Sequence, residues 1–107
     1  MKNLDEHALA LVARYFAALS VPARLRILNH LRDGERNVGE ITAATGGTQA
    51  NVSKHLQILH THGLVSRRKD GQFVHYGLAD RRVFELCALV CDSLDDAVAS
   101  RRQLLAL

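Results

Sequence analysis

The segment from Gly46 to Val65 places an amphipathic helix between two glycine boundaries, and it constrains the fold more than any other part of the chain. Val52, Leu56 and Leu59 recur at the i, i+4, i+7 spacing of one helical face, which predicts that this face packs on a core. The opposite arc has short, polar or cationic side chains and no carboxylate: Ala50, Ser53, Lys54 and Gln57. A helix that lies against phosphates and base edges requires such a surface, whereas a merely solvated face usually carries Glu or Asp.

Signals at both ends predict a helix of about sixteen residues. Thr48 can accept a backbone N–H as an N-cap, and Gly63 can adopt the left-handed conformation that ends helices. Upstream, residues 37–40 resemble a capping box and predict a short helix through residue 45, after which Gly46-Gly47 turns the chain. This is the helix-turn-helix pattern, in which the second helix enters the major groove of DNA, although a helical hairpin in an all-α core has similar features.

Residues 64–78 predict two strands around a turn at Asp70-Gly71, a strong hairpin signal. A β-hairpin that follows a helix-turn-helix is the wing of a winged-helix domain, and this context favours the DNA-binding motif over a plain helical hairpin. The predicted wing carries Arg67, Arg68 and Lys69 beside its turn. Because phosphate contacts supply much of the affinity in protein–DNA complexes, these three residues are predicted to contact the DNA backbone.

Helical spacing also predicts a first helix over residues 4–19 and a second from Ser20-Val-Pro22 to about Arg32, with Ser20 as its N-cap. In the second helix, Leu25 is expected to pack inward, and Arg24 to stay in solvent.

A long last helix is predicted from Asp80, as its cap, to Ala99. It is apolar over much of its circumference, with one stripe formed by Val83, Cys87, Val90 and Leu94. A domain of 107 residues has little interior for so broad a face, so the helix is expected to pack on the first helix and on a second subunit. The apolar tail, residues 104–107, is expected to need similar cover.

Length and charge fit a single domain over residues 1–107 with an anionic partner. The formal net charge is +3, with basic residues concentrated between positions 48 and 82 and acidic ones in the last helix. No apolar run approaches the roughly 18 residues of a membrane span, and the N-terminus lacks the apolar centre of a signal peptide. We therefore expect no membrane association, a cytoplasmic location and cysteines that do not form a structural disulfide.

No enzyme signature is visible, since the sequence has no Gly-rich phosphate loop, Gly-x-Ser-x-Gly or His-Glu-x-x-His. The better alternative is a winged-helix module that binds another protein and has lost DNA binding. In such a module, the outer face of the second helix of the motif is expected to have lost its DNA-contacting side chains. Ser53, Lys54 and the wing cations are all present, which favours DNA binding.

The combined pattern resembles the ArsR/SmtB family of small winged-helix transcriptional repressors over roughly residues 11–94. The segments that carry the resemblance are Phe16 to Leu28, Asn51 to Leu59 with Gly63-Leu64-Val65, and Arg67 to Leu78. The resemblance implies a homodimer, held by the first and last helices, that binds operator DNA and releases it when an inducer is sensed. By position, the DNA-facing set is Thr48, Gln49, Ala50, Ser53, Lys54, Gln57, Arg67, Arg68 and Lys69. His55 also matches the family, either as a packing residue at the boundary or as a DNA contact.

The sequence departs from the family's familiar sensor sites. No cysteine lies in residues 38–42, where the arsenic-type motif would be, and the last helix has no histidine for a zinc-type site. It has Cys87 and Cys91 instead, whose i, i+4 spacing places both thiols on one face. They could ligate As(III), Sb(III), Cd(II) or Zn(II), sense thiol-reactive compounds, or pack as small hydrophobes.

Overall fold

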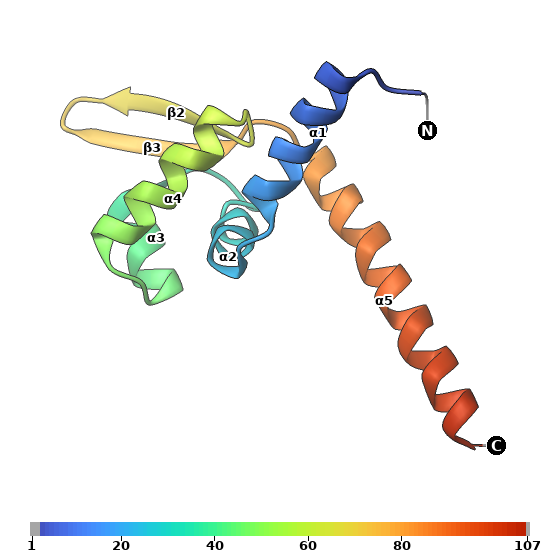
Figure 1. The fold of residues 1–107 in the computed structure, drawn as a ribbon. Helices are drawn as coiled ribbons and strands as arrows, with labels where there is room; N and C mark the ends of the chain where they lie inside the picture. The colour runs from blue at the N-terminus through green and yellow to red at the C-terminus, as the bar shows by residue number, and fades with distance from the viewer. Residues whose placement is uncertain (1–2, 107) are drawn as a thin grey trace.

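The computed structural model describes residues 3–106, and the side chains of residues 3–99 and 101. The described chain is mostly helical with one small sheet: α1 (Glu6–Leu19), α2 (Pro22–His30), β1 (Arg36–Asn37), α3 (Val38–Thr45), α4 (Gln49–Thr61), β2 (Val65–Asp70), β3 (Phe73–Leu78) and α5 (Arg82–Ala106). Helices α1 to α4 form the body, the β2–β3 hairpin projects on one side, and α5 extends away from the body (Figure 1). This is the predicted winged helix-turn-helix arrangement.

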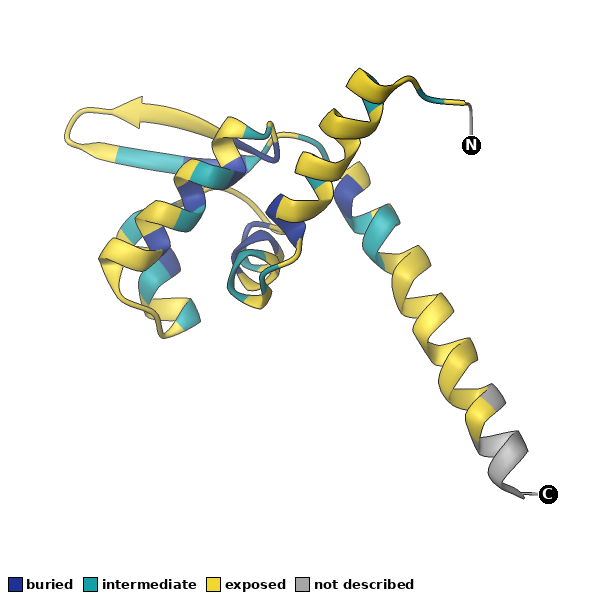
Figure 2. Cartoon of the chain, viewed as in Figure 1, coloured by how far each residue is buried: buried dark blue, intermediate teal, exposed yellow. Residues whose placement is uncertain are grey.

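One apolar core joins the helices to the base of the hairpin. Val52, Leu56 and Leu59 are each 3 % exposed or less, which confirms the predicted inner face of α4. The other buried apolar residues come from every helix and from the hairpin (Figure 2): Ala18, Leu19, Ile27, Leu28, Leu31, Ile41, Leu64, Val65, Tyr76 and Val83. The core therefore fixes the rotation of α4, and with it the face that α4 presents to solvent.

The helix ends of the motif form as predicted. Asn37 and Glu40 complete a reciprocal capping box at the start of α3, and Gly46 is left-handed with φ 75°. The Thr48 hydroxyl accepts the Asn51 N–H at the start of α4. Gly63 has φ 73°, and helix α4 has 13 residues rather than about sixteen, because its regular hydrogen bonding ends at Thr61, before the terminating glycine.

The sheet has three antiparallel strands in the order β1-β3-β2. The predicted hairpin is correct, but its turn residues are Gly71 and Gln72 rather than Asp70 and Gly71, because Asp70 pairs with Phe73 at the end of β2. Gly71 has φ 60°. The sequence did not predict β1, because two residues are too short to show an alternating pattern. Strand β1 pairs Arg36 with Tyr76 and Asn37 with His75, so it joins the hairpin directly to the residue that caps α3.

The junction between α1 and α2 differs from the prediction. Ser20 ends α1, with its hydroxyl donating to the Ala17 carbonyl, and Val21 is the N-cap of α2 without a side-chain hydrogen bond. Because Pro22 lacks a backbone N–H and has a fixed φ, it favours the first turn without a capping side chain. Helix α2 ends at His30 rather than near Arg32. Leu25 is 40 % exposed instead of packed inward, and Arg24 is half-buried instead of solvated.

Helix α5 begins at Arg82 and continues past Ala99 to Ala106. Asp80 lies before the helix, where its carboxylate accepts the Arg82 N–H and also pairs with the Arg82 guanidinium. These hydrogen bonds from the Arg82 side chain and backbone lower the pKa of Asp80. The first turns pack Val83 into the core, whereas most of the later residues are exposed (Figure 2). The prediction that the apolar tail, residues 104–107, needs cover lies outside the residues whose side chains the structure describes.

No single helix among residues 3–106 is both long and apolar enough to cross a membrane. Helices α1 and α2 together have sufficient length and composition, but they bend by 78° at their junction. In the folded chain, α2 directs Ile27 and Leu28 into the core, so these apolar side chains belong to the protein interior.

Candidate nucleic-acid interface

The outer face of α4 is open to solvent along its length. The residues predicted to face DNA on this helix are all exposed: Thr48, Gln49, Ala50, Ser53, Lys54 and Gln57. None of them is acidic, and Thr48 also caps the helix. The face therefore offers hydrogen-bonding groups and one cation without charge repulsion toward a phosphate backbone.

A groove of about 520 Å³ separates α4 from the wing. Ser53 and Gln57 line it on the helix side, Arg67 lines it on the wing side, and the buried ring of Tyr76 lies beside them. His60 and Thr61 close the groove near the end of α4. The fold thus places Arg67 against the same space as two residues of α4, which the sequence order alone does not reveal.

The three wing cations do not share one face of the hairpin. Arg67 pairs with Tyr76 and Lys69 with Val74, and side chains alternate along a strand, so these four lie on the face toward the helices. Arg68 pairs with His75 and lies on the opposite face. The continuous sequence Arg67-Arg68-Lys69 is therefore divided between two surfaces.

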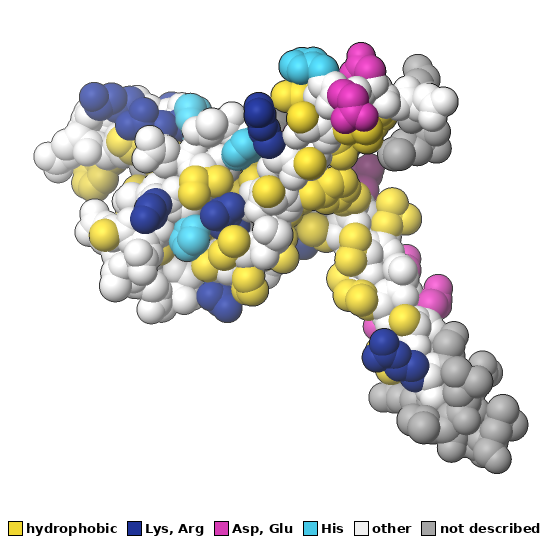
Figure 3. Space-filling view, in the orientation of Figure 1, with side chains coloured by type: hydrophobic (Ala, Val, Ile, Leu, Met, Phe, Trp, Pro, Cys, Tyr) yellow, Lys and Arg dark blue, Asp and Glu magenta, His cyan; other side chains and the backbone are white. Residues whose placement is uncertain are grey.

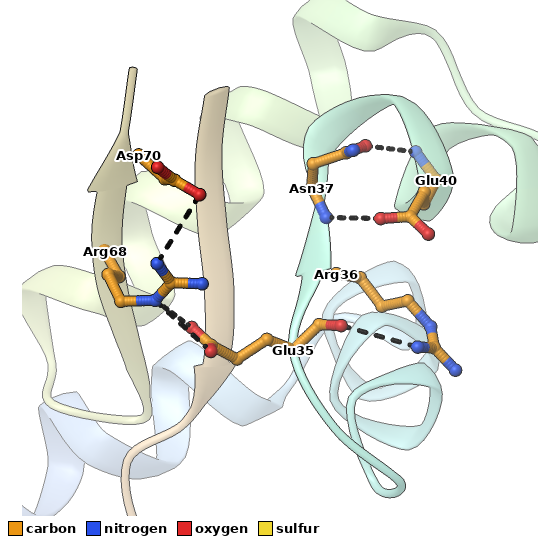
Figure 4. Close-up of polar contacts among 6 residues, drawn as sticks. All are labelled: Glu35, Arg36, Asn37, Glu40, Arg68 and Asp70. Carbon is orange, nitrogen blue, oxygen red and sulfur yellow. Dashed lines mark hydrogen bonds and ion pairs between the residues drawn. The ribbon is translucent and has the colours of Figure 1, made fainter. Parts of the chain in front are cut away.

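Arg68 contacts two carboxylates instead of standing free (Figure 4). Its Nε lies 3.2 Å from Glu35 Oε2, and its Nη1 lies 3.9 Å from Asp70 Oδ2. Glu35 was not predicted from the sequence, because this residue reaches Arg68 only when β1 is brought alongside β3. The pair is exposed, so its contribution to stability is small, about 0–1 kcal/mol. Its effect is to neutralise one of the three wing cations.

Acidic side chains on the visible face lie at the beginning of α1 and along α5, and none is seen over the hairpin or the helical body next to it (Figure 3). Lys and Arg side chains lie over the hairpin and the body, and some also lie on α1 and α5 (Figure 3). The visible side of the motif is therefore cationic.

His55 is a boundary residue in this structure. Its side chain is partly buried, and its Nδ1 accepts a hydrogen bond from Arg24 Nε at 3.2 Å. The pKa of His55 is lowered mainly by burial, and the positive charges of Arg24 and Lys54 lower it further. Between its two alternatives, the structure supports the packing role. The contact of Arg24 was not predicted from the sequence, because His55 is distant from it in the chain.

The two cysteines lie on one side of α5 with different exposure. Cys87 is half-buried and Cys91 is exposed. Cys87 lines an apolar pocket of about 260 Å³ between α1, α2 and α5, together with Phe16, Leu19, Ser20, Leu25, Leu86 and Val90. Among the described residues, no group of three or more His, Cys, Asp or Glu side chains could hold a metal ion. Within one chain the pair therefore offers only two soft ligands.

The apolar surface of α1 and α5 remains uncovered in the single chain. On α1 the exposed large residues are Leu9, Leu11, Val12 and Phe16, and on α5 they are Leu89, Val90, Leu94 and Val98. Leu94 is 61 % exposed. Contiguous apolar surface of this kind marks an interaction site more often than a solvated face.

Comparison with known proteins identifies the family. The family model described as "Bacterial regulatory protein, arsR family" matches residues 21–67, which include α2, α3, α4 and the start of the wing. The chain is 41% identical over 88 residues to the "Probable mercury resistance operon repressor" of Streptomyces lividans, covering 81% of this chain and 70% of that protein. The protein belongs to the ArsR family. Its relatives are transcriptional regulators and not enzymes, as the sequence predicted.

Solved structures of two similar proteins share the fold of this ArsR-family chain. A homodimeric winged helix-turn-helix DNA-binding domain from Mycobacterium bovis is 37% identical, with a TM-score of 0.74, covering 90% of this chain and 92% of that one. The antimony-specific transcriptional repressor AntR is 26% identical, with a TM-score of 0.75, covering 92% of this chain and 90% of that one. These likenesses confirm the predicted winged helix-turn-helix class. The individual DNA-facing residues stay predictions.

Proposed function

We propose that this chain is a cytoplasmic, homodimeric repressor that binds operator DNA through α4 and the wing, and that a thiophilic inducer releases it. The observation that carries the proposal is the exposed, carboxylate-free face of α4, which shares a groove with Arg67 of the wing. The alternative, a winged-helix module that binds only proteins, gives no reason for such a face.

The geometry supports a division of roles among the predicted contacts. Lys54, Arg67 and Lys69 are assigned to phosphates, since all three are exposed cations on or beside the groove side. The assignment to base edges applies to Gln49, Ser53 and Gln57, whose groups can exchange hydrogen bonds in the major groove. Ala50 allows close approach, Thr48 fixes the helix end, and Arg68 reaches a phosphate only if it leaves Glu35.

The exposed apolar faces of α1 and α5 support a dimer. Val90 and Leu94 are exposed to water in the single chain, and burying them against a second copy would be favourable. A twofold dimer presents two copies of α4, and they fit successive major grooves when they lie about 34–36 Å apart. The proposal therefore includes an operator with inverted symmetry.

Cys87 and Cys91 are the proposed inducer ligands. Two thiolates suit soft ions, and the names of two relatives refer to mercury and antimony, which are soft in this sense. The pair fits such an ion only in part, because a three-coordinate or four-coordinate ion needs further ligands from a second copy or from solution. A disulfide within one helix is less suitable, since i, i+4 Cβ atoms lie about 6 Å apart and a disulfide needs about 3.8 Å.

The proposed function is tested in two steps. Selection of bound duplexes from genomic fragments identifies an operator. Sedimentation then measures dimerisation, and fluorescence anisotropy measures the preference for this operator over competitor DNA. A protein that stays monomeric at micromolar concentration, or prefers no duplex, contradicts the repressor and favours the protein-binding module.

The inducer is tested by titrating the complex with arsenite, antimonite, Cd(II), Zn(II), Hg(II) and a persulfide donor. Wild type is compared with Cys87→Ser and Cys91→Ser, each checked for folding and operator binding. Loss of release in either variant supports the thiol site. If both are released as readily as wild type by every agent, the cysteines are packing residues.

A further inference from the structure

Arg24 connects three helices through a single side chain. It lies in the first turn of α2, and its Nε donates to His55 Nδ1 on α4 at 3.2 Å. Its Nη1 donates to the carbonyl oxygen of Ala18 at 3.2 Å and lies 3.4 Å from that of Ala17, both in the last turn of α1. A cation at this position also suits the negative end of the α1 dipole.

The contact to His55 requires one protonation state. Nδ1 can accept a hydrogen bond only when the imidazole is neutral, with its proton on Nε2. Burial favours the neutral form, and the facing charges are all positive: Arg24 and Arg26 from α2 and Lys54 from α4. No carboxylate lies within ion-pair distance of Arg24 in the part of the chain that the structure describes. The guanidinium is therefore committed to the helix ends and to His55.

We propose that Arg24 is a positioning residue that fixes the angle of α4 relative to α1, so that operator affinity depends on a side chain held between helices. This inference rests on the proposed operator binding. Helix α1 packs on α2, and α2 packs on α4. If α1 lies at the subunit interface, its angle to α4 sets the separation of the two recognition helices in the dimer. A small change in that angle moves both helices away from successive grooves.

The chain provides a matched control for the charge. Arg26 lies on the same helix and is exposed, and no side-chain hydrogen bond of Arg26 occurs among the described residues. Arg24→Met and Arg26→Met each remove one positive charge from α2, but only the first removes the connection to α1 and α4. For the partner, His55→Gln keeps an oxygen acceptor, whereas His55→Leu removes it.

The first measurement needs no DNA. Spin labels at Ala10→Cys on α1 and Ser53→Cys on α4, in a Cys87→Ser/Cys91→Ser background diluted with unlabelled protein, report the intrasubunit distance distribution by double electron–electron resonance. Arg24→Met and His55→Leu are expected to shift or broaden this distribution, whereas Arg26→Met and His55→Gln preserve it. The pKa of His55, measured by NMR, is expected to rise in Arg24→Met because a nearby positive charge has been removed.

The second measurement compares unlabelled variants on operator and non-specific duplexes. Arg24→Met is expected to weaken operator binding by roughly 5- to 150-fold relative to Arg26→Met, the range of typical coupling between sites. On non-specific duplexes the two variants are expected to lose the same affinity, because each removes one positive charge. Thermal unfolding curves identify the temperatures at which Arg24→Met and Arg26→Met are both folded, and binding is compared only there. If Arg24→Met is unstable, Arg24→Lys replaces it. Unchanged distances and affinities in Arg24→Met overturn the inference. Absence of any preferred duplex for wild type overturns the proposed function instead, and the label distances still decide whether Arg24 positions α4.

Discussion

The division of the wing cations predicts unequal salt dependence for two adjacent arginines. Arg67 lines the groove beside α4, whereas Arg68 lies on the other face and pairs with Glu35. Arg67→Ala should therefore remove one interaction with a phosphate, and Arg68→Ala should remove none. Removing one such interaction reduces the slope of log affinity against log salt by about 0.9. A fourfold rise in salt should then narrow the affinity gap between wild type and Arg67→Ala by roughly 3.5-fold.

The assay is fluorescence anisotropy on one labelled duplex, at several salt concentrations between about 50 and about 200 mM. Arg14→Ala is the control for total charge, since Arg14 is an exposed cation on α1. Arg67→Ala is expected to flatten the slope, while Arg68→Ala and Arg14→Ala keep the wild-type value. Equal flattening by Arg67→Ala and Arg68→Ala would refute the division of the wing and show that the Glu35 pair opens on DNA.

Three further predictions concern assembly, pH and the core. Leu94→Asp should produce monomers that keep the helical circular dichroism spectrum, because Leu94 is 61 % exposed in the single chain; sedimentation measures this, and an intact dimer would contradict the α5 interface. The lowered pKa of His55 means that the unfolded chain binds its proton first as pH falls, so the free energy of unfolding should decrease from about pH 6.5 downward. Chemical denaturation of wild type and His55→Gln measures the difference, and identical pH profiles would exclude His55 as the cause. Leu59→Ala should cost about 2–5 kcal/mol in urea unfolding, since Leu59 is fully buried; a cost below about 1 kcal/mol would show that the site collapses around the cavity.

The parts of the fold that the sequence predicted are those with local causes. A capping box, a left-handed glycine and an i, i+4, i+7 stripe each depend on residues within two turns of one another, so the boundaries of α3 and the inner face of α4 could be predicted directly. The hairpin followed from the Asp70-Gly71 sequence signal for the same reason, although the turn itself lies at Gly71 and Gln72. Errors arose where the local signal was ambiguous, as at Ser20, which could cap the end of one helix or the beginning of the next.

The candidate site depended on contacts between distant segments. Arg24 and His55 are 31 residues apart, and Arg68 and Glu35 are 33 apart. Such pairs leave no periodic pattern in the chain, because their geometry is set by how the elements pack rather than by the repeat of one element. The sequence alone therefore determined that the outer face of α4 has no carboxylate and that the wing carries three adjacent cations, where both were expected to meet DNA. Only the tertiary structure decided which wing arginine faces the groove and which side chain ties α4 to α1, since both answers depend on β1 and α2 lying beside elements far away in the chain.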